Sequence, residues 1–251
     1  MIGAGNVAFH LAPALKDAGY KILQVFNHTK ESAKVLAGRL HCSYTNNMDH
    51  IRNDAGVYIL ALTDTADIEF VSKFSFPEAV VVHTSGGLDL DIFKGKVKNY
   101  GVIYPVQTFS KFREVDLRPA PVCLEASNPE TEKVLFELAD RISDNPVKIN
   151  SKQRLYLHIA AVFACNFVNH MYVISSEILR NSGLPFSLLQ TLIKETAEKV
   201  VEYPPLEVQT GPALRNDQIV IEKHLDLLSF SGQFKKIYRE LSDSIHLMKH
   251  S

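Results

Sequence analysis

Glycine and alanine residues at the start of the chain have the spacing of a phosphate-binding turn. The opening Met1-Ile2-Gly3-Ala4-Gly5-Asn6-Val7-Ala8 matches the G-x-G-x-x-G/A pattern of dinucleotide-binding proteins. The first glycine permits a tight turn, the second lets a phosphate approach the backbone, and the N–H groups that begin the next helix attract an anion. We therefore predict that Gly3, Gly5, Asn6 and Val7 bind a dinucleotide cofactor. A glycine turn without a ligand is the alternative.

The residues after the next expected strand bear on the choice between NAD and NADP. NAD-binding proteins usually carry an acidic residue about 20 positions beyond the glycine motif, where it holds the ribose 2′-hydroxyl. The segment Phe26-Asn27-His28-Thr29-Lys30 has no acid. Asn27, His28 and Thr29 can donate hydrogen bonds to a 2′-phosphate instead, so we predict NADP(H) as the cofactor. An ordinary exposed loop is the alternative.

Small polar residues follow three later strand-like segments, at the edge where open α/β sheets bind ligands. We predict that the cofactor is also contacted by Leu62, Thr63 and Thr84. In the same region, we predict that Ser85 takes part in catalysis and that Gln107 binds the substrate.

Four polar residues recur along an apolar helix expected over residues 152–180. At about 100° per residue, Arg154, His158, Asn166 and Asn169 fall on one arc of that helix. Burying each of them without a partner would cost about 1–3 kcal/mol. A substrate between two domains is one possible partner, and another helix or subunit is the alternative. We predict that His158 and Asn166 are catalytic and that Arg154 binds substrate.

Two histidines are candidates for a proton donor. An imidazole with a pKa near 6.5 can give and take a proton near neutral pH. His158 lies on the polar arc, and we predict that it acts in this way. His83 ends a strand-like segment, where a buried core histidine is at least as good an interpretation.

A further candidate for substrate binding is Arg215, in the segment Thr210-Gly-Pro-Ala-Leu-Arg-Asn-Asp217. The planar guanidinium makes paired, charge-assisted hydrogen bonds with a carboxylate. A structural ion pair of Arg215 with Asp217, or of Asp217 with His224, is the alternative.

Composition limits the class of protein. The 251 residues carry a net charge of −1, which argues against a nucleic-acid partner. Cys42, Cys123 and Cys165 lie far apart without metal-ligand spacing, which is typical of reduced thiols and predicts no metal site. The longest apolar runs, at 57–62 and 79–82, are far shorter than the roughly 18 residues of a membrane span, and we find no leader. We expect a soluble cytoplasmic protein that binds no membrane.

The elements that would position these residues alternate in the first half of the chain. We expect strands at 21–26, 56–62, 79–83, 102–106, 120–125 and 147–150, and helices at 31–40, 64–74 and 130–142. This alternation predicts a mostly parallel sheet with crossover helices. The strand expected before Gly3 is represented only by Met1 and Ile2, so we expect that it is truncated or incompletely given.

After Asn150 the periodicity is helical throughout. We expect helices at 152–180, 186–202, 214–228 and 231–248. The prediction is therefore an α/β Rossmann domain over residues 1–150, followed by an all-α domain over residues 151–251 that binds substrate or mediates dimerisation.

Several segments together resemble a known family, the Rossmann-plus-DUF2520 proteins within the wider 6-phosphogluconate dehydrogenase-like superfamily of reductases. They are GAGNVAFHL at 3–11, LALTDT at 60–65, HTSGG at 83–87, YPVQTF at 104–109, HIAAVFACN at 158–166 and TGPALRND at 210–217 followed by His224. The resemblance implies an NADP-type Rossmann domain, a helical C-terminal domain and a homodimer, without a settled substrate. Superfamily hydroxyacid dehydrogenases carry a catalytic lysine and an asparagine one turn later, whereas Tyr156 follows Lys152 here.

We therefore predict an NADP-dependent oxidoreductase that transfers a hydride to or from a small carbonyl, imine or hydroxy acid between the two domains. A non-catalytic NADP(H)-binding sensor or interaction protein is the alternative. The sequence does not decide whether a deazaflavin partner is used.

Overall fold

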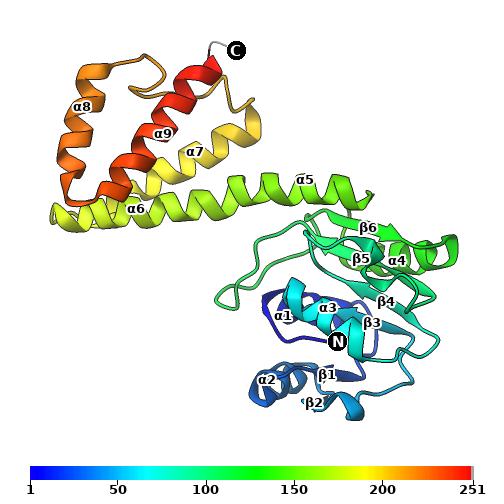
Figure 1. Cartoon of the computed structure of the whole chain (residues 1–251). Coiled ribbons are helices and arrows are strands. Elements are labelled where there is room, and N and C mark those ends of the chain that lie inside the picture. Colours follow the sequence, from blue (N-terminus) through cyan, green and yellow to red (C-terminus); the bar gives the residue numbers. More distant parts are fainter. Residues whose placement is uncertain (250–251) are drawn as a thin grey trace. The chain divides into compact units, whose positions relative to one another are not determined.

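The computed structural model describes residues 1–249, which form two compact units (Figure 1). The first unit is Met1–Cys165, and the second begins at Asn166. The sequence predicted a boundary near residue 150, whereas the division between the units falls later, inside a long helix.

The first unit contains the alternating strands and helices. The strands are β1 (Gln24–Phe26), β2 (Ser43–Thr45), β3 (Val57–Leu60), β4 (Val80–His83), β5 (Asn99–Pro105), β6 (Val122–Ala126) and β7 (Pro146–Lys148). The helices are α1 (Asn6–Asp17), α2 (Lys30–Leu40), α3 (Asp64–Lys73), α4 (Pro129–Ile142) and α5 (Ser151–Ala161). The sequence did not predict β2, which has only three residues and is mostly exposed.

The strands form a mostly parallel sheet, which confirms the predicted α/β class. β1 pairs with β2, and the remaining strands follow the order β3-β4-β5-β6-β7, in which only the β5–β6 pair is antiparallel. Ile2 joins the two groups, since it forms parallel bridges with both Phe26 and Leu60. Met1 and Ile2 thus occupy the place of the strand expected before Gly3.

Buried side chains cover both faces of the sheet. Val82 packs in one cluster with Leu11 of α1 and Leu135 of α4. The adjacent Val81 packs in another cluster with Phe70 of α3. Consecutive strand residues point to opposite faces, so this separation places helices on both sides, as a buried parallel sheet requires.

The second unit is helical. Its elements are α6 (Val168–Asn181), α7 (Gln190–Glu202), α8 (Gln218–Leu227) and α9 (Gly232–Lys249), with short 3₁₀ turns at Phe186–Leu189 and Leu228–Phe230. Gly183, with φ +73°, follows the end of α6, and Pro204 follows the end of α7. Residues 166–249 contain no strand, which confirms the predicted helical character of this part of the chain.

α5 and α6 belong to one continuous helix, Ser151–Asn181, of 31 residues. By length and composition this helix could cross a membrane, because its mean hydropathy reaches 1.5 over 18 residues. The sequence prediction considered only uninterrupted apolar runs and therefore missed this property. Length and hydropathy alone are weak evidence for a membrane span, since helices of soluble proteins can have the same length and hydropathy.

Candidate functional site

The glycine motif forms a turn between Ile2 and α1. Gly3 has φ +110°, and a Cβ there would overlap the carbonyl group of Ala61 after β3. This position therefore needs glycine for its backbone conformation and for the close approach of a neighbouring segment. Gly5 is the N-cap residue of α1, and both Gly5 and Asn6 are exposed. The fully buried Ala8 packs close to the sheet, as the motif predicts.

Asn27 joins the glycine turn to the segment after β1. Its Oδ1 accepts a hydrogen bond from the Ala4 N–H at 3.2 Å, and its Nδ2 donates to the Thr29 carbonyl at 3.2 Å. The side chain predicted to contact a 2′-phosphate is thus engaged in holding the turn. His28 and Thr29 are exposed and lie next to it in the chain.

The residues predicted after β3 and β4 lie at the ends of adjacent parallel strands. Leu62 is half-buried, and the exposed Thr63 is the N-cap residue of α3. Thr84 is buried, and its N–H donates to the Leu60 carbonyl at 3.0 Å. Thr63 therefore offers an accessible hydroxyl at this edge, whereas Thr84 contributes mainly to the sheet.

Ser85 stabilises the loop after β4 through its hydroxyl group. Oγ donates to Asp64 Oδ1 at 2.7 Å and accepts hydrogen bonds from the N–H groups of Gly87 and Leu88, each at 3.0 Å. A hydroxyl has one donor and two acceptor positions, so all of them are used. This geometry does not support the predicted catalytic role of Ser85 and instead indicates a role in positioning the loop.

His83 is a core residue. Its side chain is buried beside the Phe93 ring, and Nδ1 accepts a hydrogen bond from the Ser85 N–H at 3.2 Å. Burial, together with the nearby charge of Arg154, lowers the pKa of His83 to about 3. A neutral, buried imidazole fits the core interpretation that the sequence left open.

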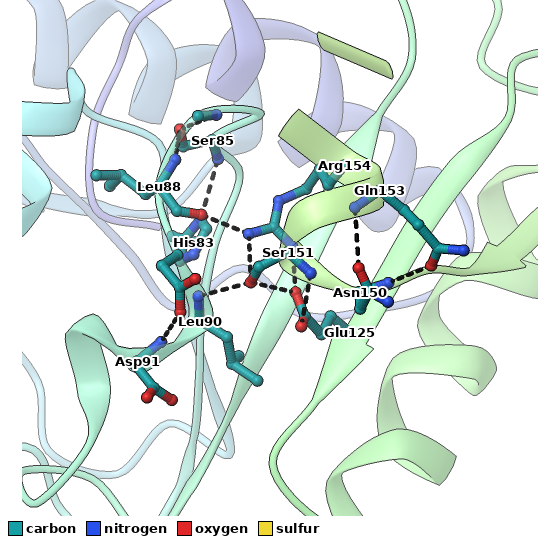
Figure 2. A network of polar contacts seen from close by, with 12 residues as sticks. His83, Ser85, Leu88, Leu90, Asp91, Glu125, Asn150, Ser151, Gln153 and Arg154 are labelled. Carbon is teal, nitrogen blue, oxygen red and sulfur yellow. Dashed lines mark hydrogen bonds and ion pairs between the residues drawn. The ribbon is translucent and has the colours of Figure 1, made fainter. Parts of the chain in front are cut away.

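Arg154 lies at the centre of a buried polar network (Figure 2). Its guanidinium forms an ion pair with Glu125 of β6 and donates to the Leu88 carbonyl after β4. Ser151, at the start of α5, extends the network: its N–H and Oγ each donate to Glu125 at 2.8 Å, and Oγ accepts from the Leu90 N–H at 3.0 Å. These contacts fasten the first turn of α5 to the sheet.

Only 1% of the Arg154 side chain is exposed, and its charge is paired inside the protein. The geometry therefore does not support the predicted contact with substrate. We interpret Arg154 as a positioning residue for α5. The Asn150 and Gln153 side chains complete the start of this helix, since each accepts a hydrogen bond from the other's backbone N–H at 2.9 Å.

Further along α5, His158 contacts two segments at the carboxyl edge of the sheet. The Tyr104 hydroxyl, at the end of β5, lies 3.1 Å from His158 Nδ1. A Cβ on Gly86 would lie 2.6 Å from Cγ and Nδ1 of the same ring. His158 is half-buried by these contacts, and all three residues belong to the first unit. The arrangement presents a histidine and a phenol together at the edge where α/β sheets bind ligands.

Tyr104 is the residue that the sequence reasoning missed. Burial raises the pKa of Tyr104 above its ordinary value, which further favours the protonated phenol. The segment Tyr104-Pro-Val-Gln107 contributed to the family resemblance, but only Gln107 was predicted to act. In the structure Gln107 is exposed, and its Oε1 accepts the Thr108 N–H at 2.8 Å.

The predicted polar arc is interrupted. Val162–Phe167 forms a π-helix, in which the backbone hydrogen bonds span one more residue than in an α-helix. The uniform rotation assumed from the sequence therefore does not extend from His158 to Asn166 or Asn169. Asn166 lies within the π-helix and is exposed. Single π turns occur frequently at functional sites.

Arg215 lies in the second unit, exposed on the turn before α8. Neither alternative ion pair forms within residues 1–249. Asp217 instead caps α8, since its Oδ1 accepts the Val220 N–H at 3.2 Å. His224 Nδ1 lies 2.7 Å from the Tyr238 hydroxyl. Arg215 therefore stays available for an external anion.

A cavity of about 290 Å³ lies away from these groups. It is lined largely by the segments that begin β1 and β3, at the opposite edge of the sheet from the glycine turn. Residues 1–249 contain no group of three His, Cys, Asp or Glu side chains that could hold a metal ion.

A glycine turn on a mostly parallel sheet, followed by an all-helical unit, defines a Rossmann-type nucleotide-binding architecture. A family model described as Domain of unknown function (DUF2520) matches residues 120–245, and the chain belongs to this family. No protein of the curated set matches the chain.

Solved structures share the whole architecture. A "putative NADP oxidoreductase" from Bacteroides fragilis is 43% identical, with 98% of this chain and 96% of that chain covered and a TM-score of 0.94. Protein TM1727 from Thermotoga maritima is 23% identical, with 96% and 98% covered and a TM-score of 0.76. An imine reductase from Myxococcus stipitatus in complex with NADP+ is 16% identical, with 99% and 91% covered and a TM-score of 0.65, and shares the fold.

Proposed function

We propose that the protein is an NADP(H)-dependent oxidoreductase acting on a small carbonyl, imine or hydroxy-acid substrate. The Bacteroides fragilis relative, named for NADP oxidoreductase activity, supports the reaction class because its identity extends over nearly the whole chain. The glycine turn supports the cofactor class, since Gly3 occupies a position where no side chain fits and Gly5 and Asn6 leave the start of α1 accessible.

The observation that carries the proposal is the Tyr104–His158 contact beside Gly86. A bound nicotinamide supplies or accepts the hydride. Reduction of a carbonyl or imine also requires a proton at the oxygen or nitrogen, and a positioned imidazole can deliver it. His158 is our proton donor, with Tyr104 hydrogen-bonded to it. Asn166 stays a proposed catalytic residue, and Gln107 and Arg215 stay proposed substrate contacts, since each has an exposed side chain.

Replacement of His158 tests this assignment. We expect His158→Ala to lower turnover by about 10²- to 10⁴-fold, the range of general acid catalysis, in a screen of small ketones, imines and hydroxy acids. NADPH affinity should not change. His50→Ala, which replaces an exposed histidine, is the control. Unchanged turnover in His158→Ala would remove this residue from the mechanism, and NADPH binding without turnover of any substrate by the wild type would favour the sensor alternative.

The preference for NADP(H) is a separate proposal. His28 and Thr29 are the accessible donors after β1, next to Lys30 at the start of α2. We expect NADPH to bind more tightly than NADH, and His28→Ala combined with Thr29→Ala to reduce this difference. Parallel fluorescence titrations with the two cofactors measure it. Tighter binding of NADH would overturn the assignment.

We also propose that the protein is a soluble, cytoplasmic homodimer formed through its C-terminal helices. Large apolar side chains are exposed on the long helix and on α7, among them Val173, Leu192 and Val201. We propose a protein partner rather than a lipid partner, because the long helix begins at Ser151 and its first turn is bound to the first unit through Arg154. Leu192→Glu should produce a monomer in sedimentation experiments, whereas Val35→Glu on α2 should not. A wild-type monomer would refute the proposal.

A further inference from the structure

A segment that follows β5 lies across the outside of α1. We call residues 108–114 the α1 strap. His10 Nε2 lies 3.0 Å from the Ser110 carbonyl, and the His10 ring stacks on Phe109 with a centroid distance of 5.1 Å. Near its end, Glu114 forms an ion pair with Arg39 of α2 at 3.0 Å. Contacts on both sides therefore hold the strap in place, and all of these residues lie in the first unit.

Lys111 extends from the strap to the glycine turn. Its Nζ donates a hydrogen bond to the Ala4 carbonyl at 3.0 Å and lies 5.6 Å from the centroid of the Phe9 ring. Ala4 lies between Gly3 and Gly5, two residues before the start of α1. An ammonium group has three donors, so two of them are still available beside the turn that we assign to the cofactor.

The charge of Lys111 is also available. Lys111 forms no ion pair with a carboxylate in the described part of the chain. The neighbouring cation Arg39 differs, because its guanidinium pairs with Glu114 and lies 4.7 Å above the Phe9 ring. In a chain with a net charge of −1, attraction for an anionic cofactor must be local.

We propose that Lys111 binds the pyrophosphate group of the dinucleotide and that the α1 strap positions it for this contact. The inference rests on the proposed function, since it requires a dinucleotide at the glycine turn. It goes beyond the glycine motif, because the cation comes from a segment more than 100 residues away in the sequence. Lysine is a common ligand of phosphate groups.

The test compares Lys111→Gln with Arg113→Gln, which removes the same charge from an exposed side chain of the same strap. The chain has no tryptophan, so the fluorescence of NADPH itself reports binding directly. We expect Lys111→Gln to weaken NADPH binding roughly 10- to 100-fold, the range for hydrogen bonds to charged groups. The Arg113→Gln variant should stay within about three-fold of the wild type, and added salt should reduce the difference between the two variants.

Competition with cofactor fragments locates the effect. ADP-ribose contains the pyrophosphate, whereas adenosine 2′-monophosphate lacks it. Lys111→Gln should weaken ADP-ribose binding and leave adenosine 2′-monophosphate unchanged. If the wild type binds NADPH and Lys111→Gln binds it equally well, Lys111 only stabilises the Ala4 carbonyl and the inference is wrong, while the proposed function stands. If the wild type binds neither NADPH nor ADP-ribose, both proposals are wrong.

Discussion

The Tyr104 hydroxyl and His158 Nδ1 lie 3.1 Å apart, although 54 residues separate them in the sequence. Tyr104 lies near the end of β5 and His158 lies two turns into α5, so the contact forms only when that helix is fastened to the sheet. The phenol can donate to Nδ1 of a neutral imidazole, which then carries its proton on Nε2, and it can accept from Nδ1–H of the imidazolium, the form that donates a proton. In both forms the contact fixes the orientation of the His158 ring.

Replacement of Tyr104 should change this tautomer. In Tyr104→Phe we expect the fraction of His158 protonated at Nε2 to fall, because the donor to Nδ1 is lost. Nitrogen-15 NMR of the imidazole measures the change without a substrate. With a substrate from the screen, the pH profile of kcat/KM should shift as well, and the free energy of unfolding should fall by only about 1 kcal/mol. An unchanged tautomer ratio would contradict the role of Tyr104.

A side chain on Gly86 should displace His158. In Gly86→Ala the new Cβ would lie 2.6 Å from two atoms of the imidazole, so the ring or the loop must move. We expect a loss of turnover and about 1–3 kcal/mol of destabilisation, which is typical of overpacking. The rate of NADPH oxidation with a substrate from the screen and urea unfolding measure the two effects. Gly56→Ala is the matched control, because a Cβ there meets nothing within 4 Å.

The Arg154–Glu125 pair should be a major contribution to stability. Arg154→Met leaves the Glu125 carboxylate without its cation, and breaking a buried pair typically costs about 3–5 kcal/mol. The double variant Arg154→Met/Glu125→Leu should recover part of this loss, because no buried charge is left unpaired. For comparison, Lys148→Met breaks an exposed pair with Glu132 and should cost less than about 1 kcal/mol. Urea unfolding measures the free energy of unfolding of each variant. An equal loss in Arg154→Met and in Lys148→Met would contradict this interpretation.

Asp67 should make stability depend on pH. Burial, reinforced by the negative charge of Asp64, raises the pKa of Asp67 from 3.8 to about 7. The folded state therefore holds this proton more tightly than the unfolded state, and stability falls as pH rises from about 4 to about 7. The full effect is on the order of 4 kcal/mol, at about 1.4 kcal/mol per pKa unit.

The variant Asp67→Asn should remove this dependence. Its free energy of unfolding relative to the wild type should rise between pH 4 and pH 7 and then stay constant. Asp140→Asn, at an exposed position, should show no such trend. A difference between Asp67→Asn and the wild type that is independent of pH would show that Asp67 has an ordinary pKa in the folded protein.

Local patterns in the sequence predicted the fold class and most of the elements. The spacing of Gly3, Gly5 and Ala8 predicted a turn that leads into a helix, because these requirements involve backbone conformation and close packing within a few residues. Runs of apolar residues and the helical periodicity of apolar residues likewise predicted the strands and helices. Each of these patterns depends only on which side chains of a single element are buried. The three-residue β2 carried too little pattern to be found.

The roles of individual polar residues depended on the tertiary structure. Ser85, Arg154 and His158 all looked like site residues in the sequence, because each is a polar side chain where ligands commonly bind. The fold uses the Ser85 hydroxyl and the Arg154 charge internally, and it places His158 beside Tyr104. Hydrogen-bond partners that are distant in the sequence decide which polar groups stay available for chemistry. The sequence alone therefore determined the architecture, and the tertiary contacts decided which of its polar residues can act.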